Sequence, residues 1–285
     1  MSKLLELDHV TKRYPVGGLF SRQTIKAVND VSFSLDSDKP EIFAIVGESG
    51  SGKSTMAKMM LGNEVPNEGR LVFDGTDIGT IRTRAAREAF MAKVQPVFQN
   101  PFEAFNPLTQ VDTYLFGTAR RFVGAKTQQE QERVCDEALQ RVGLSMAEIK
   151  GRFSHELSGG QLQRVAVARA LIPSPKLIVA DEPVSMVDAS LRMSIVNLFR
   201  QLRDEIRVSI IYITHDLATA YYISDRVIIM QKGVVIESGD ARAVLDNPTH
   251  PYSIALKNAV LPPDPKAASA AIRQRNIASA AQPAA

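Results

Sequence analysis

The sequence predicts an α/β fold in which helices cover a parallel sheet. Residues Ile42–Val46 are all apolar, which is typical of a strand buried on both faces. A glycine-rich turn and a helix follow directly, over residues 47–61, and complete the strand–loop–helix unit of such folds. Three further runs of sheet-forming residues come later in the chain, at Leu177–Ala180, Val208–Thr214 and Arg226–Met230.

Other short strands surround this unit in the sequence. We expect strands at Leu4–Val10 and Val31–Leu35 before it, and at Arg70–Phe73 after it, where Asp74 and Gly75 close the strand. The run Arg226–Met230 connects through Gln231, Lys232 and Gly233 to Val234–Glu237, which predicts a hairpin.

The middle of the chain, residues 110–156, is helical in character. Thr127 and Glu130 form a capping box, and apolar residues then recur on one helix face, at Val134, Cys135, Ala138, Leu139 and Val142. Cys135 on this face is interpreted as a core residue. Another helix begins after Ser158. Residues 241–261 are expected to fold as an appendage, and the Ala-, Pro-, Ser- and Gln-rich residues 262–285 to form a disordered tail.

The composition is that of a globular protein with a sizeable core, since 45% of the 285 residues are hydrophobic and 23% are charged. A net charge of +3, with both signs interspersed, gives no argument for a nucleic-acid partner. Cys135 is the only cysteine, so a disulfide within the chain is excluded. We find no signal peptide and no apolar run near the roughly 20 residues of a bilayer span, so we expect a cytosolic chain that meets a membrane only through a partner.

Residues Gly47–Ser54 fit the pattern G-x-x-x-x-G-K-[ST] between a buried strand and a helix. Glycines expose backbone N–H groups to phosphate oxygens, and the helix N-terminus adds positive potential. Lys53 can neutralise the β- and γ-phosphates, and the Ser54 hydroxyl can bind magnesium. The alternative, an ordinary Gly-Ser turn, is disfavoured by the strand–helix context.

Two carboxylates and a histidine follow later strands. Asp181 and Glu182 end the run that begins at Leu177, so Asp181 can orient the magnesium shell and Glu182 can orient, or accept a proton from, the attacking water. His215 follows the strand Val208–Thr214 and is expected at the same sheet edge, where α/β folds bind ligands. A solvated turn and a structural histidine are the alternatives.

A second glycine-containing helix start lies at residues 157–161, which read Leu157, Ser158, Gly159, Gly160 and Gln161. Ser158 is a natural N-cap, and the glycines leave the first N–H groups uncovered. The segment alone is compatible with an ordinary capped helix. If the segment binds an anion, it is a second anion site in the same chain. One nucleotide needs only one such site, so the second one would act on a partner's nucleotide.

Together these motifs resemble the ABC ATPases. The resemblance covers residues 4 to about 240 and rests on Gly47–Thr55 as Walker A, Gln99, the signature Leu157–Gln161, Asp181-Glu182-Pro183, Asp188 and His215. It implies a P-loop NTPase fold with a RecA-like core, an antiparallel β subdomain, a helical signature subdomain at about residues 100–160 and a short C-terminal extension. The ATPase domain would span residues 1–240, with the extension over 241–261.

The resemblance also implies residue roles and a head-to-tail dimer of cassettes. Tyr14 resembles the aromatic residue that stacks on adenine, Gln99 the glutamine that contacts magnesium and senses a membrane partner, and Asp188 the aspartate of the loop linking the two sites. The remaining ATP contacts fall on Walker A, at Gly47, Ser49, Gly50, Ser51, Gly52, Lys53, Ser54 and Thr55. Met186 and Val187 stand where Ala-Leu is common, an apolar exchange.

A finer resemblance is to the second ATPase of the oligopeptide, dipeptide and nickel importers. It rests on the insert at residues 14–22, on Phe98–Pro107 and on the box Asn247–Tyr252. It implies ATP and Mg²⁺ as cofactors, a second ABC ATPase subunit, two transmembrane permease subunits, an external substrate-binding protein and a peripheral location on the cytoplasmic face of the inner membrane. No cysteine follows Cys135, so the iron–sulfur cluster of some relatives cannot form.

Several functions remain open at this point. An importer of oligosaccharides or other solutes, or a non-import ABC system, is the alternative to a peptide importer. A GTPase is excluded because no Asn-Lys-x-Asp sequence is present. The loop with Phe98, Phe102 and Phe105 is too short to bury all three rings, so we expect exposed aromatics that receive a helix of the membrane subunit. The alternative is that these rings cap the helical core.

Overall fold

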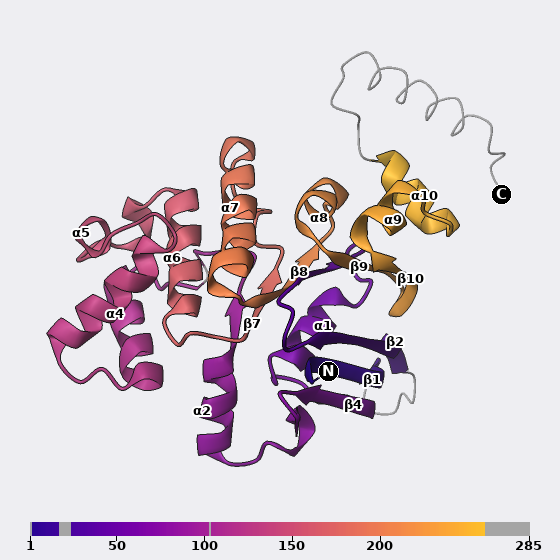
Figure 1. The fold of residues 1–285 in the computed structure, drawn as a ribbon, viewed down its shortest axis with the longest axis horizontal. Helices are drawn as coiled ribbons and strands as arrows, with labels where there is room; N and C mark the ends of the chain where they lie inside the picture. The colour runs from indigo at the N-terminus through magenta and orange to yellow at the C-terminus, as the bar shows by residue number, and fades with distance from the viewer. Residues whose placement is uncertain (1, 17–23, 103, 260–285) are drawn as a thin grey trace.

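A six-stranded sheet forms the centre of the molecule in the computed structural model, which describes residues 2–16, 24–102 and 104–259 (Figure 1). Its strand order is β10-β9-β3-β8-β7-β6. Neighbours from β9 to β6 pair in parallel, and β10 pairs with β9 in the antiparallel sense. The strands are β3 (Ile42–Val46), β6 (Val94–Val97), β7 (Leu177–Asp181), β8 (Ser209–Thr214), β9 (Arg226–Gln231) and β10 (Val234–Asp240).

The sheet is buried on both faces, as the apolar run Ile42–Val46 predicts. All five residues of β3 are buried, and alternate residues enter different apolar clusters. Phe43 and Ile45 pack with the methionines of α1 (Lys53–Met60). Ala44 and Val46 pack with α8 (Leu217–Ile223), while the neighbouring strand β8 turns Ile210 and Tyr212 towards α7 (Ala189–Gln201). The predicted parallel sheet covered by helices is therefore confirmed.

A second, antiparallel sheet has the order β2-β1-β4-β5 and packs beside α1. Its strands are β1 (Lys3–Pro15), β2 (Thr24–Asp36), β4 (Glu68–Phe73) and β5 (Thr76–Asp77). Strands β1 and β2 extend well beyond the predicted runs, because their outer halves pair with each other as far as Pro15 and Thr24. In these outer halves Thr24–Lys26 are exposed and Lys12–Tyr14 only half-buried, so hydrophobic patterning gives no signal there.

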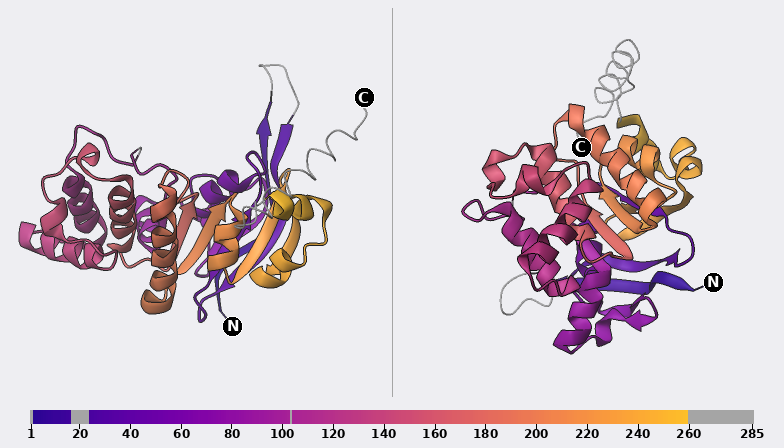
Figure 2. Two further views of the ribbon diagram at one scale, coloured as in Figure 1. Left: turned by 90° about the horizontal axis from the view of Figure 1, so that it is seen from above. Right: turned by 60° about the vertical axis from the view of Figure 1, so that its left-hand side comes forward.

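The helical part lies to one side of the large sheet, as Figure 2 shows. Thr127 and Glu130 form the predicted capping box, and Cys135 is fully buried, where burial raises the pKa of its thiol to about 12. Both predictions are confirmed. The helices here are α3 (Val111–Thr118), which continues as a wider turn over Ala119–Val123, α4 (Gln128–Gln140), α5 (Met146–Ile149), a short turn Ser154–Glu156 and α6 (Gly159–Leu171).

Several elements have no counterpart in the sequence predictions, among them α7, α8, β5, β6 and α2 (Arg84–Lys93). Helix α2 is mostly exposed and buries Phe90, and β6 reads Val-Gln-Pro-Val, which is short and contains proline. A proline at this strand is tolerated because β6 lies at the sheet edge. Two further short turns complete the connections, Ile78–Thr80 and Leu202–Ile206.

The C-terminal segment begins with the predicted hairpin, which is confirmed: β9 and β10 turn through Lys232 and Gly233, both with positive φ. Helices α9 (Ala241–Asp246) and α10 (Pro251–Ala259) follow and pack on the large sheet. The predicted disordered tail, 262–285, lies outside the described residues. Within 2–16, 24–102 and 104–259, no helix is both long and apolar enough to cross a bilayer.

Candidate functional site

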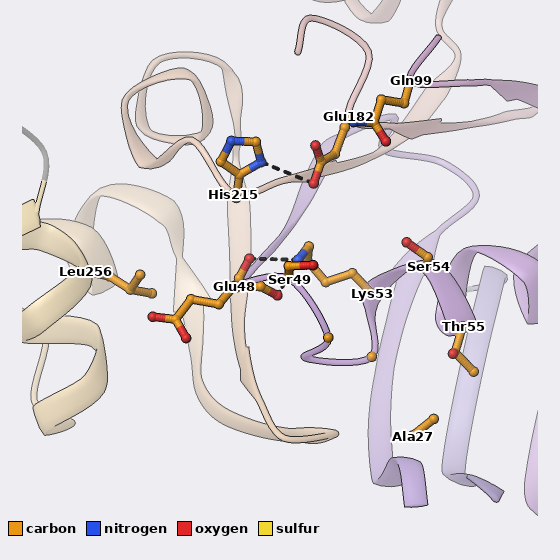
Figure 3. A pocket seen from close by; sticks show the side chains of 13 residues that line it. Ala27, Glu48, Ser49, Lys53, Ser54, Thr55, Gln99, Glu182, His215 and Leu256 are labelled. Atoms are coloured by element: carbon orange, nitrogen blue, oxygen red, sulfur yellow. Dashed lines mark hydrogen bonds and ion pairs between the residues drawn. The ribbon is translucent and has the colours of Figure 1, made fainter. Parts of the chain in front are cut away.

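The carboxyl ends of the central strands meet at a pocket of about 610 Å³ (Figure 3). Strand β3 leads into the glycine-rich loop, β7 ends at the Asp181–Glu182 pair, and β8 ends just before His215. Parallel pairing puts these ends on one edge, as predicted. The lining residues are Ala27, Gly47, Glu48, Ser49, Gly50, Gly52, Lys53, Ser54, Thr55, Gln99, Glu182, His215 and Leu256.

The glycine-rich loop leaves the start of α1 open. Gly52 is the N-cap residue with φ 106° and makes no side-chain cap. A Cβ at Gly52 would lie 2.2 Å from the Ala27 carbonyl oxygen, so the loop's close approach to β2 requires glycine. The first N–H groups of a helix have no intrahelical acceptor, and here they face a pocket that can take an anion.

Lys53 is buried and points back into the loop. Its Nζ donates to the carbonyl oxygens of Gly47 at 2.7 Å and Glu48 at 2.8 Å. Burial lowers the pKa of Lys53, an effect opposed by the nearby carboxylates of Glu182 and Asp181. An ammonium held by two carbonyl oxygens can transfer to phosphate oxygens without leaving the pocket.

Glu182 and His215 face each other across the pocket. The Glu182 Oε1 lies 3.1 Å from the His215 Nδ1, and the Glu182 backbone N–H donates to the Ile213 oxygen at 2.8 Å. Glu182 has a φ of 47°, an uncommon left-handed conformation for a non-glycine residue, which turns it away from the strand direction. The pair can hold and orient a water molecule beside the glycine-rich loop.

Asp181 lies next to the loop's first helical turn. Burial raises the pKa of its carboxyl, Glu182 raises it further, and a hydrogen bond with the Ser54 side chain opposes the rise. Asp181 lines a neighbouring hollow with Gln99, and Gln99 also lines the main pocket. Gln99 therefore lies between the main pocket and the neighbouring hollow. Phe98 and Met186 also line the neighbouring hollow.

The start of α6 is a separate feature on the helical part. Ser158 is its N-cap, as predicted: the Gln161 N–H donates to the Ser158 Oγ at 3.2 Å, and the Ser158 N–H donates to the Gln161 Oε1 at 3.1 Å. Ser158 is exposed, Gly159 is half-buried, and Leu157 and Gly160 are buried. None of these residues lines the pocket at Lys53.

Three other predicted site residues also lie outside the pocket lining. The Tyr14 ring lies in β1, with the Lys12 Nζ 5.4 Å from its centroid. Ser51 is buried, and its backbone oxygen accepts from the Gly233 N–H at 2.9 Å. Asp188 is exposed at the start of α7.

The aromatic loop differs from the expectation in one residue. Phe98 and Phe102 are 49% and 45% exposed, as expected of a contact surface. Phe105 is only 1% exposed and packs edge-on against Tyr114, with ring centroids 5.2 Å apart. The expectation that Phe105 is one of the exposed aromatics is therefore wrong, because Tyr114 on α3 packs against its ring.

Three pocket residues were not among the predicted site residues: Glu48, which lies within the glycine-rich loop, and Ala27 and Leu256. Ala27 comes from β2 and Leu256 from α10, far apart in the sequence from the loop they approach. The box Asn247–Tyr252 was the only signal near Leu256, and it carried no indication of a contact with the pocket.

Solved structures that are similar to this chain include ATP-binding cassettes. The cassette MJ0796, in a dimeric post-hydrolysis structure bound to ADP and Pi, is 28% identical with a TM-score of 0.73, and the match covers 84% of this chain and 99% of that one. CbiO1 from Clostridium perfringens, part of the ABC transporter complex cbiONQ, is 26% identical with a TM-score of 0.73, covering 96% and 100%. The fold is thus that of a P-loop ABC ATPase.

Sequence comparison gives the family. The ABC transporter profile matches residues 28–185, and the profile for the oligopeptide/dipeptide transporter C-terminal region matches residues 236–284. The oligopeptide transport ATP-binding protein AppF of Bacillus subtilis (strain 168) is 41% identical over 263 residues, covering 90% of this chain and 78% of AppF. OppF of the same strain is 37% identical, covering 96% and 87%. The chain belongs to the ABC transporter family; it binds and hydrolyses ATP.

Proposed function

We propose that this chain binds ATP in the pocket at Lys53 and powers a peptide importer. The observation that carries the site assignment is the convergence of Lys53, Glu182 and His215 on one pocket at the sheet edge. Backbone N–H groups of residues 47–55 hold the phosphates, with Lys53 neutralising the β- and γ-phosphates. Tyr14 stacks on the adenine, a role supported by its resemblance to the family pattern.

Magnesium would be held by Ser54, Asp181 and Gln99 together with the phosphates. No cluster of three or more His, Cys, Asp or Glu side chains that could bind a metal occurs among the described residues. The oxygen donors around Ser54 fit a magnesium ion that shares its shell with phosphates and water. When bound, the ion neutralises charge on the transferred phosphoryl group.

Hydrolysis needs a group that orients water at the γ-phosphate. Glu182 is proposed for this role, because its carboxylate lines the pocket and is fixed by the His215 ring at 3.1 Å. His215 then positions Glu182 in the pocket. The separate location of the segment Leu157–Gln161 supports a head-to-tail dimer in which it contacts the partner's ATP, with Asp188 between the two sites.

The site assignment is tested by Lys53→Ala in the full chain. Loss of the ammonium removes the main positive charge facing the phosphates, so ATP affinity and turnover should both fall, while the fold, measured by circular dichroism, should not change. ATP binding as tight as in the unmodified chain would overturn the assignment.

Peptide transport is supported by the relatives, whose names are oligopeptide transport ATP-binding proteins, and by the match of residues 236–284. The chain would then work on the cytoplasmic face of the membrane with a second ATPase, two permease subunits and, indirectly, an external binding protein. We infer no role for nucleic acid. An importer for other solutes or a non-import system is the alternative.

The test is to isolate the chain from its native membrane and identify what accompanies it. Two permease subunits and a second ATPase are expected, and deletion of this chain should abolish uptake of labelled oligopeptides. Normal peptide uptake with loss of oligosaccharide uptake would favour the alternative.

A further inference from the structure

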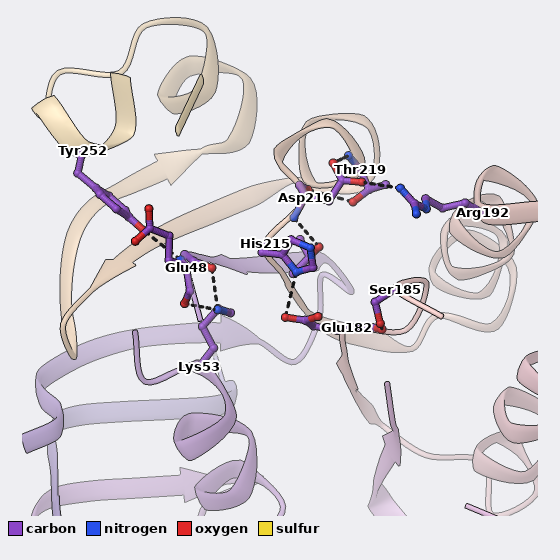
Figure 4. Close-up of polar contacts among 11 residues, drawn as sticks. Glu48, Lys53, Glu182, Ser185, Arg192, His215, Asp216, Thr219 and Tyr252 are labelled. Carbon is purple, nitrogen blue, oxygen red and sulfur yellow. Dashed lines mark hydrogen bonds and ion pairs between the residues drawn. The ribbon is translucent and has the colours of Figure 1, made fainter. Parts of the chain in front are cut away.

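The C-terminal extension makes a direct contact with the phosphate loop. The hydroxyl of Tyr252, on α10, accepts a hydrogen bond from the backbone N–H of Glu48 at 2.9 Å (Figure 4). The two residues are 204 positions apart in the sequence. One turn further along α10, Leu256 lines the pocket itself.

The segment that carries Tyr252 is held in place by hydrogen bonds, and its ring by apolar packing. The Glu237 Oε1 on β10 accepts from the Thr249 N–H at 2.6 Å and from the Thr249 hydroxyl at 2.8 Å, and it also accepts from the His250 N–H. The Tyr252 N–H donates to the His250 Nδ1 at 3.1 Å. The ring packs against an apolar cluster of the large sheet that includes Ala44 and Val46. Tyr252 is therefore a fixed support and not a loose surface side chain.

Glu48 is one of the two loop residues, with Gly47, that hold Lys53. Its carbonyl oxygen accepts from the Lys53 Nζ at 2.8 Å and from the Ser51 N–H at 3.2 Å. The same residue is thus anchored through its N–H by the extension and through its carbonyl by the loop. The N–H groups at the start of α1 are not used by this anchor and stay open to phosphate.

We propose that Tyr252 is a positioning residue of the ATP site: through the Glu48 N–H, the C-terminal extension holds the phosphate loop in its binding shape. The inference rests on the proposed ATP site at Lys53. A loop that is already ordered loses less conformational freedom when ATP binds, so the tether raises affinity. By linkage, bound ATP should stabilise α10 in turn.

The test compares Tyr252→Phe with Tyr221→Phe in the full chain. Tyr221 is the matched control, because its hydroxyl also contacts the extension, at the Asp246 Oδ2 at 3.3 Å, but not the loop. Tyr252→Phe should weaken ATP binding roughly 2- to 12-fold, the loss of one net hydrogen bond. Titration calorimetry gives the dissociation constants, and steady-state hydrolysis should show a raised KM with kcat within about twofold.

Hydrogen exchange supplies a readout that a merely structural role would not change. In the unmodified chain ATP is expected to slow exchange in α10; in Tyr252→Phe the Glu48 amide should exchange faster, and ATP should no longer slow exchange in α10. In Tyr221→Phe both should match the unmodified chain.

Either of two results would overturn the proposal for Tyr252 while leaving the ATP site at Lys53 in place. One is unchanged ATP affinity and unchanged Glu48 exchange in Tyr252→Phe; the other is an equal loss of affinity in Tyr221→Phe. Lys53→Ala, measured alongside, separates these from failure of the site assignment. If Lys53→Ala binds ATP normally, both proposals fail together.

Discussion

Two helix starts in this chain are rich in glycine and serine but lie in different surroundings. Helix α1 follows Gly52 without a side-chain cap, and its first residue, Lys53, is buried in a pocket with Glu182 and His215. Helix α6 follows Ser158, whose hydroxyl caps the helix and is exposed on the helical part. Both can attract an anion through their backbone, but only α1 lies at the ends of parallel strands.

The comparison shows what backbone geometry supplies and what it does not. A helix N-terminus gives positive potential, whereas a proton acceptor and a counter-charge have to come from other elements. At α1 we propose that these come from Glu182 and His215, which follow β7 and β8. At α6 no such strand end lines the segment, so α6 can assist a reaction but cannot perform one by itself.

The strongest test that hydrolysis takes place beside the N-terminus of α1 is Glu182→Gln. Removing the carboxylate while keeping its shape should lower ATP hydrolysis by about 10²- to 10⁴-fold, because the water loses its orienting base. ATP binding should persist, and the protein should accumulate as a closed dimer. Phosphate release and light scattering measure the two effects, and near-normal turnover would remove Glu182 from the mechanism.

The α6 end is tested by Ser158→Arg. A long cation there should block the approach of a partner's phosphate, lowering hydrolysis by about 10²- to 10³-fold if the loss matches that of one anion-binding donor. ATP binding to the monomer should stay nearly intact. Equal losses of binding and turnover would instead mean that Ser158 contacts the chain's own nucleotide.

The matched control is Thr127→Arg. Thr127 is also an N-cap in a capping box, on α4, but no glycine follows it. Thr127→Arg removes an N-cap side chain just as Ser158→Arg does. A similar loss of hydrolysis in Thr127→Arg would show that the effect of Ser158→Arg is structural.

A smaller effect is expected at the adenine. Tyr14→Ala should cost about 1–3 kcal/mol of nucleotide affinity, the value of base–aromatic stacking. Tyr14→Phe keeps the ring and should bind ATP as the unmodified chain does. Fluorescence titration distinguishes the two, and an unchanged dissociation constant in Tyr14→Ala would put the adenine elsewhere.

The smallest expected effect concerns the exposed aromatic loop beside Gln99. Phe102→Ala should weaken assembly with the permease by about 1–2 kcal/mol, as for an interface aromatic, and leave ATP hydrolysis by the isolated chain unchanged. Leu108→Ala is the control, since Leu108 is 86% exposed nearby. Phe105 is left intact because it is buried, and its loss would cost about 3–5 kcal/mol of stability. If the Phe102→Ala chain co-purifies with the permease as well as the unmodified chain does, the loop does not contact the permease and its role is structural.

The sequence predicted those parts of the molecule whose pattern is local. Ile42–Val46 is buried on both faces and therefore wholly apolar, and the capping box at Thr127 needs only residues within one turn. The expectation that Glu182 and His215 lie at the same sheet edge followed from the rule that parallel strands end at one edge, and the parallel pairing of β7 with β8 confirms it. These signals are independent of distant contacts.

The rest depends on contacts between distant segments, which leave no periodic signal. Helix α2 is mostly exposed, and β6 is a short edge strand with a proline, so neither has a clear pattern. Phe105 was misread because its cover, Tyr114, comes from a different element. Tyr252 reaches Glu48 only once the large sheet has set the position of α10.

The hairpin turn at Gly233 has a consequence for the order in which the protein is made. The Gly233 N–H donates to the Ser51 oxygen and its own oxygen accepts from the Asn29 N–H, both at 2.9 Å. At about 5–20 residues per second, roughly 10 to 40 s of synthesis separate the phosphate loop from this turn. A ribosome-bound nascent chain therefore carries a loop that still lacks its later supports, and nucleotide added during translation should be retained only after the hairpin has emerged from the ribosome.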